Sequence, residues 1–343
     1  MPTLPALDIK TNINHSPHVV ILGAGASKAA LPRGDANGKT VPVVSELIDC
    51  LNLRPMLQRH NLYCEDADFE SLYDDLVSSG KYPELVNEIE GRVQEYFSQL
   101  CPPDNATIYD YLVLSLRDKD LIASFNWDPF LALAWQRNSR AVKLPKMVHL
   151  HGNVEIAVCL ECRVKDFKGN ICQKCGKPLK PTPLLYPVKQ KNYTAHSFIE
   201  SEWNELRLFL KHAYFLTIFG YAAPKTDIEA RRLLLDAWKD NPTFELAEIE
   251  IIDLRPEIQL TKTWKEFFCS HHYSTSKSIW NSYLFHYPRR SCEAFAMATL
   301  QNMPWKDNPF PKTTSISKLQ EWARLLWSEE TKGKLSGEPF EYS

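Results

Sequence analysis

Short apolar runs alternate with amphipathic stretches along this chain. Runs at 18–22, 121–126, 147–151, 215–220 and 247–254 are rich in Val, Ile, Leu and Phe, which is typical of strands buried on both faces. Helical apolar spacing follows at 197–212 and 227–238. Strands that alternate with helices predict an α/β fold with a Rossmann-like, mainly parallel sheet and helices on both faces.

The segment from 43 to 118 interrupts this alternation. It contains several stretches with helical spacing and few strand signals. We therefore expect a core made of 1–42 and 119–255, with a helical insertion at 43–118 lying over the sheet. The remainder, 256–343, reads as a C-terminal helical region.

Composition narrows the class of protein. The net charge is −2, so no global field favours nucleic acid, and nucleic acid is not indicated as a partner. No apolar run is long enough for a membrane helix, and the first residues lack a secretory pattern. Nine cysteines, an odd number, suit reduced thiols in the cytoplasm. We expect a cytoplasmic protein without membrane contact.

A glycine-rich turn follows the first predicted strand. The turn consists of residues with small or no side chains, Gly23, Ala24 and Gly25, just before a predicted helix. An anion can therefore approach the backbone amides there closely. Ser27 can cap that helix or donate to a phosphate. A tight structural turn explains the same residues equally well. The full Gly-x-Gly-x-x-Gly pattern is absent because position 28 is Lys, which disfavours an ordinary dinucleotide dehydrogenase.

Polar residues end the next two predicted strands. Asn126 and Asp128 follow the second strand, and His151 closes the third before a glycine. Ligands bind at the carboxyl ends of strands in such sheets, so these side chains are candidates for catalysis. Asn126 can hold a water or a ribose hydroxyl, and His151 can act as a base near neutral pH. Asp128 can equally be only a helix cap, with Pro129 as the first helical residue.

Four cysteines form two Cys-x-x-Cys pairs separated by nine residues: Cys159, Cys162, Cys172 and Cys175. Two such pairs complete a closed tetrahedral site for Zn²⁺. A closed site leaves no open position for chemistry, so we expect a small structural zinc knuckle, at 157–180, with a polar loop between the pairs.

Taken in order, these motifs resemble the sirtuin family over about 18–255, apart from the insertion. The glycine turn is similar to the family's Gly-Ala-Gly-x-Ser turn, Asn126 and Asp128 to its Asn-Ile-Asp strand end, and His151 to its catalytic His-Gly pair. The zinc knuckle follows at the family's position. Gly220 with Asp227 resembles a later turn that touches ribose and phosphates. The resemblance implies NAD as a substrate.

Departures from that pattern change the expected reaction. Deacylases of the family follow the glycine turn with Pro-Asp-Phe-Arg, whereas this chain has Leu-Pro-Arg-Gly-Asp. The sequence looks more like the bacterial sirtuin-fold NADases of antiphage defence. That likeness implies hydrolysis of NAD to nicotinamide and ADP-ribose, a homo-oligomer, and a partner ATPase or sensor protein. NAD-dependent protein deacylation and non-catalytic binding of NAD or ADP-ribose remain open as alternatives.

Overall fold

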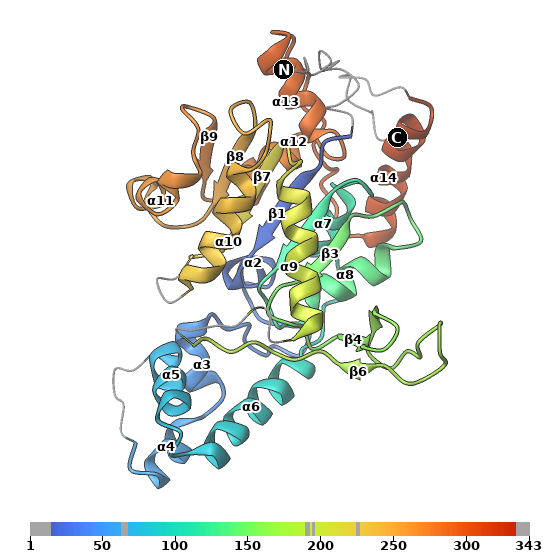
Figure 1. The fold of residues 1–343 in the computed structure, drawn as a ribbon. Coiled ribbons are helices and arrows are strands. Elements are labelled where there is room, and N and C mark those ends of the chain that lie inside the picture. The colour runs from blue at the N-terminus through green and yellow to red at the C-terminus, as the bar shows by residue number, and fades with distance from the viewer. Residues whose placement is uncertain (1–14, 63–67, 189–192, 194–195, 224–226, 334–343) are drawn as a thin grey trace.

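A six-stranded, fully parallel sheet forms the centre of the computed structural model (Figure 1), which describes residues 15–62, 68–188, 193, 196–223 and 227–333. The strand order is β3-β2-β1-β7-β8-β9. The strands are β1 (His18–Leu22), β2 (Leu121–Ser124), β3 (Lys146–His149), β7 (Phe215–Phe219), β8 (Glu248–Ile252) and β9 (Tyr273–Ser276).

The order of these strands reverses between β1 and β7. From β1 the chain moves outward to β2 and β3, then returns and continues outward through β7, β8 and β9. This is the doubly wound order that defines the Rossmann-type fold, and its crevice lies at the carboxyl ends of β1 and β7. The predicted fold class is therefore confirmed.

Apolar residues fill both faces of the sheet. Val20 and Leu22 belong to one buried cluster, whereas Val19 and Ile21 belong to another, as the period of two in a strand requires. The first face is covered by α2 (Ala24–Ala30), α7 (Ile108–Leu114), α8 (Phe130–Asn138) and α14 (Ile316–Thr331). The second is covered by α9 (Ser197–Leu210), α10 (Ile228–Lys239) and α11 (Glu257–Trp264).

The interval 43–118 is helical, as the spacing predicts. Figure 1 shows most of it as a lobe below the sheet in that view, past the ends of the strands rather than over a face. Its last helix, α7, packs on α8 and α2 and belongs to the sheet's own core. The other elements are η1 (Val44–Glu46), α3 (Leu47–Cys50), α4 (Arg54–Arg59), α5 (Phe69–Ser79) and α6 (Pro83–Ser98).

The C-terminal region is not wholly helical, which corrects the sequence prediction. β9 adds a sixth strand, and its Tyr-Ser-Thr-Ser sequence lacks the apolar run of the inner strands because it lies at the edge. The remaining elements are η2 (Lys265–Phe267), η3 (Ile279–Asn281), α12 (Tyr283–His286) and α13 (Ser291–Leu300). Residues 334–343 of the predicted region lie outside the described part.

The cysteine segment folds into a small antiparallel sheet of its own. The order is β5-β4-β6, with β4 (Ile156–Cys159), β5 (Val164–Phe167) and β6 (Lys180–Pro181). A strand, rather than the predicted loop, thus joins the two cysteine pairs. The module and α9 (Ser197–Leu210) together cover the outer edge of β3: Lys165 Nζ of the module donates to the Met147 carbonyl at 2.8 Å, and the His149 N–H donates to Glu202 Oε2 of α9 at 2.8 Å.

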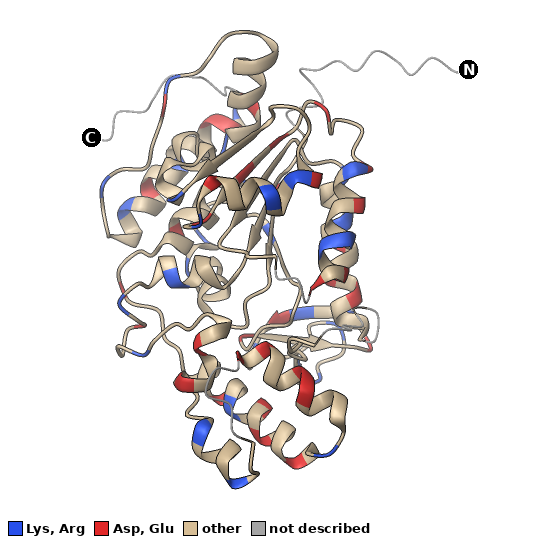
Figure 2. Cartoon of the chain, turned by 90° about the vertical axis from the view of Figure 1, so that its left-hand side faces the viewer, with Lys and Arg blue, Asp and Glu red and all other residues tan. Residues whose placement is uncertain are grey.

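Charged side chains lie mainly on helices and loops around this core (Figure 2), and both signs are present across the surface. Among the described residues, no helix is both long and apolar enough to cross a membrane.

Replacing Gly152 with Ala should destabilise the fold. Gly152 has φ +77°, and a Cβ there would overlap the backbone carbonyl of Pro183. We expect Gly152→Ala to lower the free energy of unfolding by about 3 kcal/mol or more, measured by urea denaturation. The matched control is Gly91→Ala, inside α6 with open space around it, which should gain up to about 1 kcal/mol. If the two variants unfolded at the same midpoint urea concentration, this explanation would be contradicted.

Candidate functional site

A cavity of about 810 Å³ opens at the carboxyl ends of the central strands. It lies at the switch point between β1 and β7, where the strand order predicts a ligand crevice. Most residues singled out from the sequence line it: Gly23, Ala24, Gly25, Asn126, Asp128, His151, Gly220 and Asp227. Segments far apart in the chain therefore converge on one space. The role of each residue there stays a prediction.

The glycines at this point pack backbone against backbone. The Gly23 N–H donates to the Phe219 carbonyl, and the Gly25 N–H donates to the Gly220 carbonyl, each at 3.0 Å. A Cβ on Gly23 would lie 2.5 Å from the Gly220 carbonyl oxygen. Gly220 itself has φ +63°. Close backbone packing therefore requires glycine at these positions, and the same contact places the turn at the wall of the cavity, where its role in binding stays a prediction.

Asn126 is oriented by groups behind the cavity wall. Its Nδ2 donates to the Gly23 carbonyl at 2.9 Å and to Ser27 Oγ at 2.9 Å. Because a carbonyl only accepts, this contact fixes which end of the amide faces inward. Both amide hydrogens are used there, so Oδ1 is the group left to accept a hydrogen bond from a ligand or a water.

Ser27 points away from the cavity, unlike the prediction of a phosphate donor or helix cap. It is 1% exposed, and no side chain caps α2. Its Oγ donates to Asp128 Oδ2 at 2.6 Å and lies 2.6 Å from Tyr109 Oη. Since the single Ser27 proton goes to the carboxylate, Tyr109 donates to Ser27. These residues, with Asn126, form a buried polar network, defined here as Ser27, Tyr109, Asn126 and Asp128.

Asp128 supplies the carboxyl group of the buried polar network at the cavity. It is 4% exposed, and burial raises the pKa of its carboxyl to about 6, although hydrogen bonds from Ser27 and from the Phe130 N–H oppose the shift. Helix α8 begins at Phe130, one residue later than predicted, and Pro129 takes the cap position. Asp128 nevertheless accepts a hydrogen bond from the Phe130 N–H at 3.2 Å. It therefore contacts the first turn of α8 and also lines the cavity.

His151 faces a carboxylate and a phenol. Its Nε2 lies 3.2 Å from Tyr193 Oη and 3.7 Å from Asp227 Oδ2. Tyr193 donates to Asp227 Oδ1 at 2.6 Å, and the imidazole also packs edge-on against Phe125 with ring centroids 4.8 Å apart. The imidazole side chain keeps 12% of its surface exposed. The structure thus joins two residues that the sequence had given separate roles, His151 as base and Asp227 as a nucleotide contact.

Several residues of this site carry no signal in the sequence. Tyr109 comes from α7, inside the predicted insertion, and Tyr193 precedes α9. Phe125 and Tyr221 stack with centroids 4.2 Å apart and line the cavity. Isolated tyrosines outside a motif offer no spacing that could have identified them. Basic residues also line the cavity, one in α2 and one each after β8 and β9: Lys28, Arg255 and Lys277.

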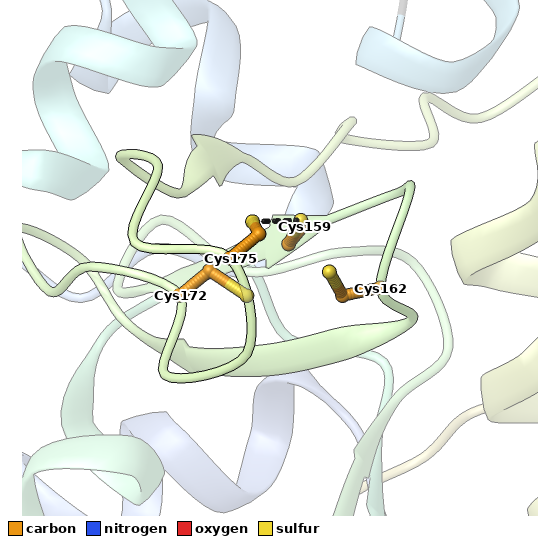
Figure 3. A group of neighbouring side chains, drawn as sticks. All are labelled: Cys159, Cys162, Cys172 and Cys175. Atoms are coloured by element: carbon orange, nitrogen blue, oxygen red, sulfur yellow. Dashed lines mark hydrogen bonds between the residues drawn. The ribbon is translucent and has the colours of Figure 1, made fainter.

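The four predicted cysteines meet in one cluster (Figure 3). Their sulfur atoms all lie within 4.8 Å of one another, and the Cys159 and Cys175 sulfurs are 3.7 Å apart. Tetrahedral Zn²⁺ with Zn–S bonds of about 2.3 Å requires sulfurs about 3.8 Å apart. The donor set therefore suits a closed, structural zinc site.

The similar proteins found for this chain are solved structures of low sequence identity. No protein-family model matches this sequence, and no curated protein matches it. Among solved structures, a Sir2 homolog–NAD complex has 15% identity and a TM-score of 0.45, covering 84% of this chain and 95% of that one. Sir2 bound to acetylated peptide has 14% identity and a TM-score of 0.39, covering 87% and 99%. At these values, the functional assignment depends on this chain's own cavity.

Neutralising Asp128 should stabilise the folded chain at neutral pH. The folded pKa of about 6 lies above the usual 3.8, so the folded state binds the proton more tightly and loses stability as pH rises through 6. At pH 7.5 we expect Asp128→Asn to raise the free energy of unfolding by on the order of 1–3 kcal/mol, seen as a higher unfolding temperature than wild type. The gain should shrink at pH 4.5. The control is exposed Asp236→Asn on α10. A gain independent of pH would contradict the burial argument.

Removing one cysteine of the cluster should release the metal. We expect purified wild type to hold about one zinc per chain by mass spectrometry, and Cys172→Ser to hold little, because three ligands no longer close the site. Cys101→Ser, an exposed cysteine outside the cluster, is the matched control. Zinc content that stays at wild-type level in Cys172→Ser would show that the cluster is not the metal site.

Proposed function

We propose that this chain is an NAD glycohydrolase, which cleaves the bond between nicotinamide and ribose and releases nicotinamide and ADP-ribose. The observation that carries the proposal is the placement of Asn126 and His151 on the wall of one cavity at the sheet's switch point. Dinucleotides bind at that point in doubly wound sheets. The volume of about 810 Å³ is in the range of small-molecule sites.

The polar groups of the cavity suit the chemistry of this bond. Nicotinamide leaves readily because its ring nitrogen is cationic in NAD, and the transition state resembles an oxocarbenium ion. Water attacks the anomeric carbon, the carbon–nitrogen bond breaks with its electrons going to nicotinamide, and the water proton is lost. Asn126 Oδ1 accepts a hydrogen bond from that water or from a ribose hydroxyl. His151 accepts the proton.

The apolar part of the wall supports the same reaction. Phe125, Trp127 and Tyr221 line the cavity beside the polar groups, and each is at least nine-tenths buried. Exclusion of bulk water strengthens electrostatic interactions with developing charge. Residues of the helical lobe, including Leu47, Glu70 and Phe97, complete the wall. We infer that movement of this lobe, or contact with a partner protein or second copy, controls access, since unrestrained NAD consumption would harm the cell.

NAD turnover by purified protein tests the proposal. We expect wild type to release nicotinamide from NAD without added peptide, and Asn126→Ala and His151→Ala to lose activity by about 100-fold or more, followed by chromatography of nicotinamide. The controls are Asn204→Ala, on the exposed face of α9, and His212→Ala, an exposed residue just after that helix; both lie outside the cavity.

The alternatives give different results in the same assay. Deacylation requires an acylated peptide before nicotinamide appears, and a binding module retains NAD or ADP-ribose without releasing nicotinamide. Equal activity in wild type and both cavity variants would remove the assignment. The sequence likeness also implies a role in antiphage defence. That role predicts that phage challenge lowers cellular NAD in cells that express the wild-type chain but not in cells that express His151→Ala.

A further inference from the structure

The glycine turn uses many of its own hydrogen-bond donors within the protein. The amides of Gly23, Gly25 and Ala26 each donate to a backbone carbonyl at 2.9–3.0 Å. The Ser27 hydroxyl donates to Asp128 Oδ2, behind the cavity wall. A charge that leaves water without a partner is costly, and a dinucleotide carries two negative charges on its diphosphate. These charges therefore call for a cation on the wall.

Among the described residues, the Lys and Arg side chains of the cavity wall are Lys28, Arg255 and Lys277. The Arg255 guanidinium is already bound to Asp253 through two hydrogen bonds, of 2.8 and 3.1 Å. Lys277 follows β9, which lies three strands from β1 and hence about 14 Å along the sheet. Lys28 belongs to α2, which begins at the glycine turn itself, and is the cation nearest to it.

The position of Lys28 on α2 directs its side chain to the turn. Residues four apart share a face of a helix, and long side chains point back toward the helix N-terminus. Ala24 lines the cavity, and Lys28 lies four residues later on the same face and lines it too. The Gly-x-Gly-x-x-Gly pattern has its third glycine at this position. This chain has an ammonium group there instead.

In the structure without a ligand, Lys28 forms an ion pair with Glu46, the last residue of η1. The lysine side chain is 46% exposed and the glutamate side chain 38%. Water screens both charges of such a pair, so it adds little to stability. A phosphate that is partly shielded from water is a stronger partner for an ammonium group. A bound diphosphate can therefore displace Glu46.

We propose that Lys28 binds the diphosphate of the dinucleotide and exchanges Glu46 for a phosphate oxygen. The orientation of the ligand rests on the proposed function, which places nicotinamide near Asn126 and His151, after β2 and β3. The cavity continues to the ends of β8 and β9 on the other side. The central diphosphate then crosses the switch point between β1 and β7, beside Lys28. Lys28 is thus a binding residue and lies away from the reacting bond.

Calorimetry with ADP-ribose, which requires no turnover, tests this contact. We expect Lys28→Gln to weaken ADP-ribose binding by about 10-fold or more and to make binding less sensitive to salt, because one screened charge contact is lost. Lys28→Arg keeps the cation and should bind within about three-fold of wild type. The matched control is Lys146→Gln, which removes an exposed lysine paired with Glu205 outside this cavity and should bind like wild type.

Glu46 gives the test its opposite sign. We expect Glu46→Gln to tighten ADP-ribose binding by about two- to five-fold, because Lys28 no longer has to leave a carboxylate. The double variant should bind like Lys28→Gln alone. If the ion pair were only structural, Lys28→Gln and Glu46→Gln would weaken binding alike, and that result would overturn the proposal. Unchanged binding by Lys28→Gln would overturn it as well.

Kinetics with NAD separate this proposal from the proposed function. We expect Lys28→Gln to raise KM by about 10-fold with kcat nearly unchanged, because the contact is made equally before and during bond cleavage. A fall in kcat at unchanged KM would contradict a binding role. If wild type binds ADP-ribose but releases no nicotinamide, the proposed function fails and calorimetry still decides the role of Lys28. If wild type does not bind ADP-ribose, the assignment of Lys28 is wrong.

Discussion

The contact between two backbone turns at the switch point of the sheet is the constraint on which the site depends. The turn after β1 and the turn after β7 approach so closely that a Cβ on Gly23 would lie 2.5 Å from the Gly220 carbonyl oxygen. Hydrogen bonds from the Gly23 and Gly25 amides close the contact. The cavity opens at this contact, so the spacing of the two halves of the sheet sets the position of the wall groups that follow the strands.

Behind that wall, polar side chains satisfy one another rather than a ligand. The buried polar network of Ser27, Tyr109, Asn126 and Asp128 fixes the Asn126 amide, and it keeps a carboxylate where burial raises its pKa to about 6. A buried charge of this kind destabilises the fold at neutral pH. The same network determines which atom of Asn126 remains available in the cavity.

The cysteine module contributes to the site through its connections. Lys165 of the module donates to the open backbone edge of β3 and pairs with Glu202 of α9, which accepts from the same edge. The segment leaving the module holds the His151 backbone through Leu185. A metal that closes the module would therefore stabilise the strand end that carries His151, without taking part in the chemistry. His151 and Asp227 come from the two halves of the sheet, and the site depends on both halves being held together.

Local sequence determined the five apolar strands, the cysteine cluster and the polar strand ends at Asn126 and His151, because strand burial, metal chelation and strand-end position leave signals within a few residues. The tertiary structure alone decided the edge strand β9, the inward turn of Ser27 and the presence of Tyr109 and Tyr193. Ser27 and Tyr109 are 82 positions apart, and Tyr193 and Asp227 are 34 apart. Such pairs meet only when the sheet is wound and the helices dock, so no local pattern of residues encodes them.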